Sequence, residues 1–487
     1  MLAKLSHYFG ENVPISQKEL ANQNPWWQNR DAIHDDFKIK QFNESQVQYF
    51  HPLVTQKYEP FSLFIIRGPR QVGKSTALKL LIRKLLSEGN NPFSIFFFDC
   101  EMLFTATEIK ETLEAYFNFI DLMEYSGVTY ISLDEIISVT DWAKIIKFLV
   151  DSGRFKKSVV FLTGSNAIDL QKGAERLPGR KGYGTEWVML PISFREYIKL
   201  RDAEFYEKIT SINDESFSLS AIYQSCTSLL PSSEKLNKLI NSYFISGGFP
   251  QLLNANVKNV QIPQQLYSNY LAWIRGDIAK HLKDERRGLQ ILVELQSVMS
   301  SRIGWDNIAR KIGGISHHTI EDHISIFEGT FLGKTLYQFD FHKKHYIYRK
   351  TKKFYFLDDL IYFVIRGVHE KWNNIFQKSV DIIQNPSECG KLMEQIVANH
   401  LLRLPRDFFG DSLGFFSNKN EIDFLLLLNN DIYPVEVKFQ QSISELDFLP
   451  FKKLGFHKGL VLTRDTFMNK GNFIAVPISH FLSILDV

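Results

Sequence analysis

Between Phe61 and Pro191, short apolar runs alternate with stretches whose apolar residues recur at helical spacing. The runs FSLFIIR, SIFFFD, TYISLD and VVFLTGS have the length and continuous hydrophobicity of strands that are buried on both faces. The segment KSTALKLLIRKLLSEG, directly after the first run, has the spacing of an amphipathic helix. The pattern therefore predicts a parallel α/β sheet in this part of the chain.

The pattern changes beyond Pro191, where strand signals stop and residues 192–285 are helical throughout. Residues 286–360 predict three short helices followed by two or three strands. From about residue 385 the pattern predicts a helix and then a hairpin formed by EIDFLLLL and IYPVEVKF. We therefore expect five parts: a helical N-terminal extension at 1–55, an α/β core at 56–200, a helical segment at 201–285, a helix-and-strand segment at 286–360 and a C-terminal α/β domain at 361–487.

Composition narrows the class of protein. A chain of 487 residues with 44% hydrophobic and 23% charged residues is typical of a folded protein of several domains. Its apolar runs are too short to span a membrane, and its three scattered cysteines predict neither a disulfide framework nor a cysteine-based zinc site. We expect a cytoplasmic protein without a membrane partner. The net charge of +3 indicates no partner, but Lys280–Lys353 holds 14 Lys and Arg against 8 Asp and Glu.

The octapeptide GPRQVGKS, from Gly68 to Ser75, matches the P-loop pattern G-x-x-x-x-G-K-[ST] between a strand and a helix. Its glycines, of which Gly73 is the second, let backbone N–H groups close around phosphates at the positive end of the helix. We expect Lys74 to bridge the β- and γ-phosphates, the Ser75 hydroxyl to ligate Mg²⁺ and Thr76 to contact the α-phosphate. The motif predicts binding of ATP and Mg²⁺.

Polar residues follow two further strands. Asp134 ends the buried strand TYISLD, where a carboxylate is costly unless it holds the metal directly or through water. Glu135 is placed to polarise a water for in-line attack on the γ-phosphate. After VVFLTG come Ser165 and Asn166, whose side chains either sense the γ-phosphate or cap a loop. These residues predict ATP hydrolysis.

Arg180, in the segment RLPGR, is either an arginine finger or an ordinary surface residue. A finger would supply positive charge to the γ-phosphate in its own subunit or in a neighbouring one. Arg70, which we also expect to contact nucleotide, and Arg176 are alternatives for this role. A finger that acts on a neighbour would require a homo-oligomer.

The segment WDNIARKIGGISHHTIEDHISIFEG predicts two helices joined by a turn at Gly313-Gly314, with the strands KTLYQFD and HYIYRK after them. This order is typical of a winged helix-turn-helix. Ser316–Thr319, at the start of the second helix, would face DNA. Six basic residues surround the strands: Lys343, Lys344, Arg349, Lys350, Lys352 and Lys353. Glu321, Asp322 and Glu328 would repel phosphates, so both a DNA contact and a protein–protein module stay open. The histidines here lack the i, i+4 spacing of paired metal ligands.

Four residues near the C-terminus form a second candidate site. Asp423 lies on EIDFLLLL, and Glu436 and Lys438 share one face of VEVKF. Glu394, on the preceding helix, completes the set. The carboxylates would hold Mg²⁺, and Lys438 would position water or stabilise the developing phosphorane. This is the arrangement of the PD-(D/E)xK nucleases. The alternatives are a chance Glu/Lys pair on a hairpin and a nuclease-like fold that only binds.

GPRQVGKST, SLDEI with the following Asp141-Trp142, TGSNA, LPGR, LPISFREY, GGFP, FYFLDD and the EIDF…VEVK pair occur in this order. Together they resemble AAA+ superfamily ATPases, common in archaea and bacteria, that carry a C-terminal restriction-endonuclease-like domain of unknown function. The resemblance covers about the whole chain. It implies an AAA+ core, a helical lid at 201–285, a winged helix at 286–360 and a nuclease-like domain at 361–487. It also supports the roles of Lys74, Ser75, Asp134 and Glu135, and Arg180 as the finger.

Three functions are consistent with these features. The first is a Mg²⁺-dependent ATPase that drives a motor or switch on nucleic acid. The second is a nucleotide-gated switch or scaffold for a protein partner. The third is a metal-dependent DNA nuclease regulated by ATP. We favour the first, because it uses both the complete ATPase motifs and the basic segment.

Overall fold

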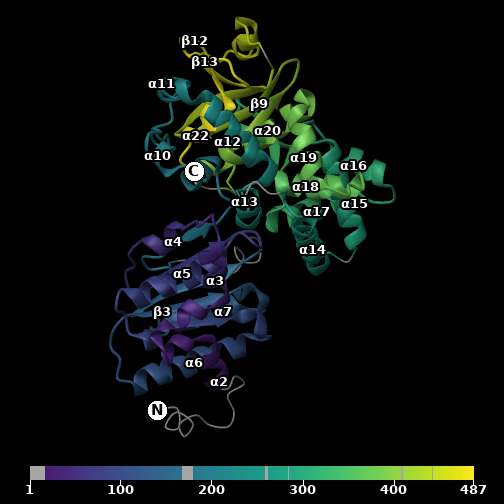
Figure 1. The fold of residues 1–487 in the computed structure, drawn as a ribbon. Coiled ribbons are helices and arrows are strands. Elements are labelled where there is room, and N and C mark those ends of the chain that lie inside the picture. The colour runs from purple at the N-terminus through teal and green to yellow at the C-terminus, as the bar shows by residue number, and fades with distance from the viewer. Residues whose placement is uncertain are drawn as a thin grey trace. The chain divides into compact units, whose positions relative to one another are not determined.

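The computed structural model of the chain describes residues 17–166, 179–257, 261–282, 284–406, 408, 410–440 and 442–487. The chain divides into two compact units, Met1–Leu190 and Pro191–Val487, which we call the N-terminal and C-terminal units (Figure 1). No helix within the described ranges is long and apolar enough to cross a membrane. Arg176 lies outside these ranges.

The N-terminal unit contains a parallel five-stranded sheet, as the apolar runs predict. Its strands in chain order are β1 (Ser62–Arg67), β2 (Ile95–Asp99), β3 (Thr129–Asp134), β4 (Ser158–Gly164) and β5 (Glu186–Val188). Their spatial order is β2-β3-β4-β1-β5, and each neighbouring pair is parallel. The carboxyl ends of β1, β3 and β4 therefore meet at one edge, with β4 in the middle. The short strand β5 has no signal in the sequence pattern.

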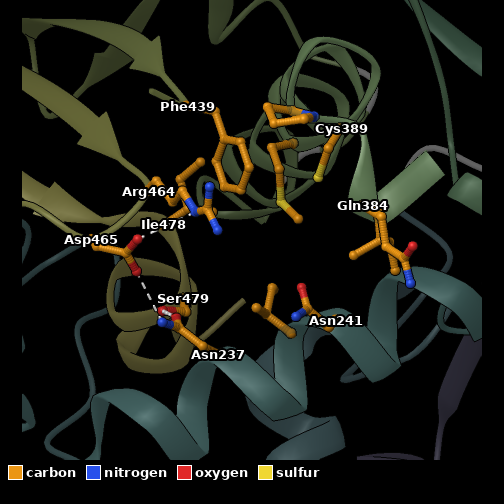
Figure 2. A pocket seen from close by; sticks show the side chains of 13 residues that line it. Asn237, Asn241, Gln384, Cys389, Phe439, Arg464, Asp465, Ile478 and Ser479 are labelled. Carbon is orange, nitrogen blue, oxygen red and sulfur yellow. Dashed lines mark hydrogen bonds and ion pairs between the residues drawn. The ribbon is translucent and has the colours of Figure 1, made fainter. Parts of the chain in front are cut away.

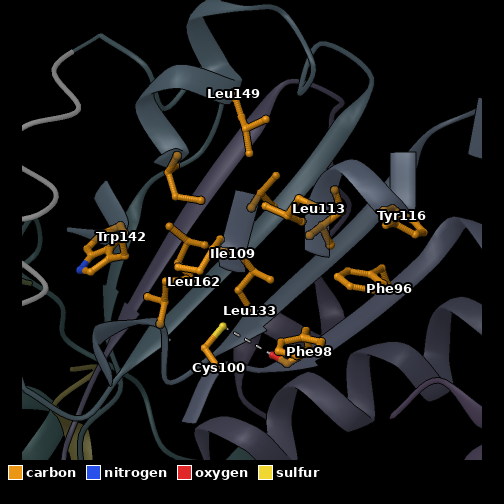
Figure 3. Close-up of a cluster of buried hydrophobic side chains, with 14 of the residues drawn as sticks. Phe96, Phe98, Cys100, Ile109, Leu113, Tyr116, Leu133, Trp142, Leu149 and Leu162 are labelled. Carbon is orange, nitrogen blue, oxygen red and sulfur yellow. Dashed lines mark hydrogen bonds between the residues drawn. The ribbon is translucent and has the colours of Figure 1, made fainter. Parts of the chain in front are cut away.

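Alternate residues of these strands face two separate cores. Leu63 and Ile65 of β1 belong to the core around Leu113 in Figure 3, whereas Phe64 and Ile66 belong to a core on the opposite face. The first face is covered by α6 (Ala106–Leu122) and α7 (Trp142–Asp151), and the second by α3 (Phe37–Glu44), α4 (Pro52–Thr55) and α5 (Lys74–Ser87). Short 3-10 helices lie in the connections between these helices and the strands: η3 (Pro92–Ser94), η4 (Cys100–Met102) and η5 (Ile136–Ser138). Burial on both faces explains why the strands are apolar throughout.

The segment before α3 covers the open edge of strand β2. It forms α2 (Gln17–Gln23), η1 (Pro25–Trp27) and η2 (Arg30–Asp35). The Asn24 side-chain amide donates to the Phe97 carbonyl at 3.0 Å and accepts the Phe97 N–H at 2.7 Å, as a neighbouring strand would. The indole N–H groups of Trp26 and Trp27 both donate to the Ile95 carbonyl. The NPWW segment thus satisfies an edge strand that would otherwise expose unpaired backbone groups.

The C-terminal unit begins with helices. They are α9 (Phe194–Arg201), α10 (Ala203–Glu207), α11 (Leu219–Ser228), η6 (Leu230–Ser232), α12 (Ser233–Ser246), α13 (Pro250–Val257), α14 (Gln264–His281), α15 (Glu285–Ser297), α16 (Trp305–Ile312) and α17 (His317–Gly329). The helical pattern of residues 192–285 and the three short helices after it predict these elements. The later helices are α18 (Asp359–His369), α19 (Ile375–Gln384), α20 (Pro386–Arg403), η7 (Glu445–Phe448), α21 (Leu449–Lys453) and α22 (Ile478–Ile484).

One mixed sheet organises the C-terminal unit, with the spatial order β12-β13-β11-β10-β9-β8-β6-β7. Its strands are β6 (Gly333–Asp340), β7 (His345–Phe356), β8 (Leu413–Ser417), β9 (Glu421–Leu428), β10 (Asp431–Lys438), β11 (Gly459–Thr463), β12 (Met468–Lys470) and β13 (Phe473–Pro477). The predicted hairpin is β9 and β10, which pair antiparallel. The strands that we expected in a separate winged helix, β6 and β7, join the same sheet through a β6–β8 pairing. The division of this unit at residue 360 stays a prediction.

A buried aspartate joins two distant segments of the C-terminal unit. One carboxylate oxygen of Asp358 accepts the Gly248 N–H at 2.8 Å, and the other caps α18 by accepting the Leu360 N–H at 2.9 Å. Gly247, which ends α12, has a φ of +62°, and a Cβ at that position would lie 1.9 Å from the Asp358 Oδ1. The GGFP and FYFLDD motifs therefore depend on each other for their packing.

We expect Gly247→Ala to lower the free energy of unfolding by more than about 1 kcal/mol, because a side chain there is strained and displaces Asp358. The measurement is urea unfolding monitored by circular dichroism. Gly276→Ala is the control, since Gly276 lies exposed on α14 and a Cβ there meets nothing within 4 Å. The control should match or exceed wild-type stability. Equal stability of the two variants would contradict the proposed packing role.

A buried histidine makes the C-terminal unit sensitive to acid. His400 Nε2 accepts the Phe194 N–H at 3.0 Å, and its Nδ1 lies 2.8 Å from the Ile396 carbonyl, so the ring is neutral and donates from Nδ1. Burial and then the nearby Arg403 guanidinium lower the pKa of His400 to about 3. In the unfolded chain the ring takes up a proton below about pH 6.5. Because the folded pKa is depressed, stability is present above pH 6.5 and is lost as the pH falls toward 3.

We therefore expect the free energy of unfolding to decrease between pH 7.5 and pH 5, as measured by urea titrations at each pH. His400→Gln removes this titration, so its stability should fall less steeply over the same interval, whatever its stability at pH 7.5. An unchanged slope in the variant would show that other groups control the acid sensitivity.

Candidate functional site

The P-loop connects β1 to α5 and needs glycine at two positions. Gly73 precedes the helix with a φ of +106°, in the left-handed region that favours glycine. A Cβ on Gly68 would lie 2.2 Å from the Met189 carbonyl oxygen, so the first glycine lets the loop pass close to the residue that follows β5. Gly73 supplies the left-handed turn before the helix that a phosphate cradle requires.

Lys74 is held inside this loop, with its side chain 4% exposed. Its ammonium group donates to the carbonyl oxygens of Gly68 at 2.9 Å and Pro69 at 3.0 Å. It also lies 3.4 Å from the Glu135 Oε1. The P-loop lysine is thus paired with loop carbonyls and with the predicted catalytic glutamate.

Asp134 lies buried at the end of β3, 6% exposed, as its strand-end position predicts. Its Oδ1 accepts the Thr163 hydroxyl at 2.5 Å, and the Ser75 hydroxyl also donates to the carboxylate. Burial raises the pKa of Asp134, although the two hydroxyl groups act in the opposite direction. The structure thus brings together the two residues that we expect to hold Mg²⁺, Ser75 and Asp134. A hydroxyl and a carboxylate are hard oxygen donors of the kind that Mg²⁺ prefers.

Glu135 has a left-handed backbone with a φ of +49°, and its side chain contacts Lys74 of the P-loop. Its N–H donates to the Thr163 hydroxyl oxygen at 2.9 Å, and its Oε2 accepts the Ser165 N–H at 3.0 Å. Burial alone would raise the pKa of Glu135, but the Lys74 ammonium and the Ser165 N–H hold it below its usual range. The glutamate is therefore ionised. Thr163, which positions both acidic residues, is absent from our sequence-based candidates.

Other predicted nucleotide contacts lie at the same edge of the sheet. Asn166 is 6% exposed and follows β4, the strand between β1 and β3, so it lies between the P-loop and the acidic pair. Arg70 and Thr76, both partly buried, belong to the loop and the first turn of α5. Whether Asn166 senses a phosphate or caps the loop stays open.

Arg180 lies at the opposite edge of the sheet. Its guanidinium forms two hydrogen bonds with Asp151, at the end of α7, at 2.6 and 3.1 Å. The adjacent Lys181 carbonyl accepts the Leu63 N–H near the start of β1, whereas the P-loop follows the end of that strand, roughly 16 Å away. The structure does not bring Arg180 to the P-loop of its own chain. A role as a finger would need the P-loop of another subunit.

The second predicted set does come together in the C-terminal unit. Asp423 and Glu436 lie on neighbouring strands, where the Asp423 N–H donates to the Glu436 Oε1 at 3.3 Å and the Val437 N–H donates to the Asp423 Oδ2 at 3.0 Å. Lys438 pairs with the Glu436 Oε2 at 3.0 Å. Glu394 reaches the cluster from α20. We call Glu394, Glu421, Asp423, Glu436, Lys353 and Lys438 the acid cluster.

Lys353 is the member of the acid cluster that sequence reasoning misplaced. We expected Lys352 and Lys353 on the basic surface of the hairpin, but they are only 6% and 1% exposed. Lys352 packs over the Trp305 ring, and Lys353 points into the acid cluster. Tyr355, two residues further on the same face of β7, donates to the Glu394 Oε1 at 2.5 Å. The sequence signal for this position was the spacing of Lys353 and Tyr355, two residues apart on an apolar stretch of strand.

Burial perturbs two carboxyl groups of the acid cluster. It raises the pKa of Glu394 to about 7, although the Lys353 ammonium opposes the shift. Burial, and then the Asp423 carboxylate, raise the pKa of Glu436 to about 8. Both shifts reflect the loss of hydration of carboxyl groups that lie close to one another.

The C-terminal unit also has a cavity of about 300 Å³, where the parallel strands β10, β11 and β13 end (Figure 2). Phe439 and Arg464 follow β10 and β11, and Cys389 lines it from α20. Asn237 donates to Asp465 at 3.0 Å and accepts the Ser479 hydroxyl at 2.8 Å, so part of the polar wall is internally satisfied. Carboxyl ends of parallel strands are common positions for ligand sites.

Three family models match parts of this chain. Residues 60–198 match an AAA domain, residues 237–370 match a domain of unknown function (DUF8612), and residues 389–481 match another domain of unknown function (DUF4143). The first match covers the P-loop, Asp134 and Glu135, and it supports a nucleotide-binding AAA ATPase domain. The other two assign no activity, so the expected winged helix and nuclease-like domain gain no support from them. No curated protein matches the chain.

Three solved structures are similar to parts of the chain. The RuvB Holliday junction branch migration motor of Thermotoga maritima is 11% identical, with 66% of this chain and 89% of that chain covered and a TM-score of 0.27. Cdc6p of Pyrobaculum aerophilum is 11% identical, with 77% and 97% covered and a TM-score of 0.25. AMPPCP-bound DnaA of Aquifex aeolicus is 11% identical, with 63% and 92% covered and a TM-score of 0.25. Scores this low carry no argument about this chain.

We expect Glu135→Gln to lower kcat for ATP hydrolysis by at least about 100-fold, because the amide cannot accept a proton from water. ATP binding should persist, since the variant also removes the ion pair that holds Lys74. The measurements are phosphate release and binding of a fluorescent ATP analogue. Glu111→Gln, on α6 away from the loop, is the matched control and should hydrolyse ATP at the wild-type rate. Undiminished turnover in Glu135→Gln would remove this residue from the reaction.

Proposed function

We propose that this chain is a Mg²⁺-dependent ATPase that acts on nucleic acid through its C-terminal unit. The ATPase part of this proposal rests on one buried contact. The ammonium of Lys74, in the P-loop, lies 3.4 Å from the carboxylate of Glu135, which follows β3. The match of residues 60–198 to an AAA domain supports it.

Lys74 and Glu135 neutralise each other's charge in this structure. Phosphate oxygens of ATP would compete for the Lys74 ammonium, which among the described residues is held by two neutral carbonyls and this glutamate. Once Lys74 turns to the phosphates, Glu135 keeps its hydrogen bond from the Ser165 N–H and is able to accept a proton from water. Mg²⁺, held by Ser75 and Asp134, would neutralise phosphate charge. ATP binding thus prepares the base for hydrolysis.

The nucleic-acid part rests on the segment from α16 to β7. α16 and α17 flank Gly313 and Gly314, whose φ values of +78° and +70° permit a tight turn. Ser316 caps α17 by accepting the Thr319 N–H at 3.1 Å, and Ser316, His317 and His318 are exposed at the helix start. We interpret α15, α16, α17 and the β6–β7 hairpin as a winged helix-turn-helix, with α17 as the helix that approaches a groove.

Four basic residues of the hairpin are exposed: Lys343, Lys344, Arg349 and Lys350. Throughout the part of the chain that the structure describes, none of the four forms an ion pair with a carboxylate. Unpaired exposed lysine and arginine side chains beside a recognition helix are suited to phosphate contacts. Glu328, which we expected to repel phosphates, instead accepts the Thr335 N–H at 2.7 Å and points to β6.

A protein partner is the alternative, and Glu321 and Asp322 favour it. Both acidic residues are exposed on α17, where they would face the phosphates of a bound duplex. In that case ATP binding would control contact with a protein instead. We favour nucleic acid because the hairpin offers four exposed cations and α17 only two exposed carboxylates.

We expect the double variant Lys343→Gln/Lys350→Gln to bind duplex DNA more weakly than wild type in gel-shift assays at low salt. The slope of log K against log salt should shrink by about 0.9 for each lost phosphate contact. Lys378→Gln/Lys391→Gln removes the same charge from exposed positions on α19 and α20 and should bind like wild type. Equal loss in both double variants would indicate a non-specific charge effect. Absence of any DNA or RNA binding by wild type would leave the protein-partner switch.

A further inference from the structure

The acid cluster raises a question of fit, because the resemblance to nucleases implies a divalent cation held by Glu394, Asp423 and Glu436. A shared cation requires their oxygen atoms to converge on one point. Among the described residues, the group of three potential ligands whose donor atoms all lie within 4.8 Å of one another is His317, His318 and Glu321. Glu394, Asp423 and Glu436 do not form such a group.

The Lys353 ammonium lies between two carboxylates of this set, Asp423 and Glu394, and also contacts Glu421. Its Nζ lies 3.2 Å from the Asp423 Oδ1, 3.3 Å from the Glu394 Oε1 and 3.4 Å from the Glu421 Oε1. With a side chain 1% exposed, the ammonium has no access to solvent and depends on these partners. A buried charge is tolerated only when it is paired and hydrogen-bonded. The Lys353 side chain of β7 therefore already supplies the positive charge that these carboxylates require.

Three further oxygens of the acid cluster are also engaged. The Asp423 Oδ2 accepts the Val437 N–H, and the two oxygens of Glu436 contact the Asp423 N–H and the Lys438 ammonium. The Tyr355 hydroxyl donates to the Glu394 Oε1 as well. A divalent cation would have to displace the Lys353 ammonium and several of these hydrogen bonds together.

We infer that the Lys353 ammonium is the resident cation of the acid cluster, and that the C-terminal unit does not hold Mg²⁺ there for phosphodiester cleavage. The residue types and their proximity are those of a PD-(D/E)xK set. Their contacts, however, form an ion-pair network in which Lys353 takes the place of a metal ion. The network joins β7, α20 and the β9–β10 hairpin within one unit.

The test is a Mn²⁺ titration of the nucleotide-free full chain, followed by electron paramagnetic resonance. All samples carry Asp134→Asn, which removes the carboxylate of the P-loop metal site. The parent chain, which keeps Lys353, should bind Mn²⁺ equally with and without the additional substitution Asp423→Asn. Lys353→Met should gain one bound Mn²⁺ per chain, at least ten-fold tighter than any site in its parent, and Asp423→Asn should abolish that gain. Lys352→Met removes a neighbouring buried lysine outside the acid cluster and should gain nothing.

Two results would overturn the inference. One is Mn²⁺ bound by the Lys353-containing chain and lost with Asp423→Asn, a comparison that holds even if Lys353→Met fails to fold. The other is a folded Lys353→Met chain that gains no Mn²⁺. Incubation of the same proteins with plasmid DNA and Mg²⁺ adds a second readout, since cleavage that Asp423→Asn abolishes would also contradict the inference. ATP hydrolysis enters neither measurement, so the outcome is independent of the proposed function.

Discussion

Burial of the central sheet on both faces is the constraint that positions the nucleotide site. Helices cover both sides of β1, β3 and β4, so the strand interiors accept only apolar side chains and polar chemistry is confined to the strand ends. Because the three strands are parallel, their carboxyl ends meet at one edge, where the P-loop, the acidic pair and Asn166 follow them. Thr163, the last but one residue of β4, connects the acidic pair by hydrogen bonds to Asp134 and Glu135.

Much of this arrangement was predictable from the sequence, because continuous apolar runs and a glycine-bounded loop are strong local signals. Helical spacing predicted the helices from residue 192 to α17 and the helix α20, and apolar runs around a turn predicted the β9–β10 hairpin. The strands β5, β8, β11, β12 and β13 were not, because each spans only three to five residues and gains its identity from pairing. The position of Lys353 was also unpredictable. A lysine on a strand faces solvent by default, and only the approach of α20 and β9 turns this one into a core residue.

The position of Arg180 illustrates a similar limit. The segment RLPGR indicates a charged loop after the fourth strand, but sequence alone does not say at which edge of the sheet the chain returns. The pairing of Ser62 with Gly182 places that return at the start of β1. An arginine there is remote from the P-loop of its own chain and pairs with Asp151 instead. Topology, and not residue type, decides which nucleotide such an arginine is able to reach.

Lys74 and Lys353 are both buried lysines beside carboxylates, and the difference between their partners separates a ligand site from an internal ion pair. Lys74 donates to two backbone carbonyls of a loop that is closed by glycines, with a single carboxylate at 3.4 Å. Neutral carbonyls hold an ammonium weakly, so an anion of high charge is able to take it over. Lys353 lies within 3.4 Å of three carboxylates, so an incoming anion would be repelled and an incoming cation would find the position filled. The same side chain is therefore suited to the phosphate binding that we propose for the N-terminal unit, and in the C-terminal unit it neutralises carboxylates.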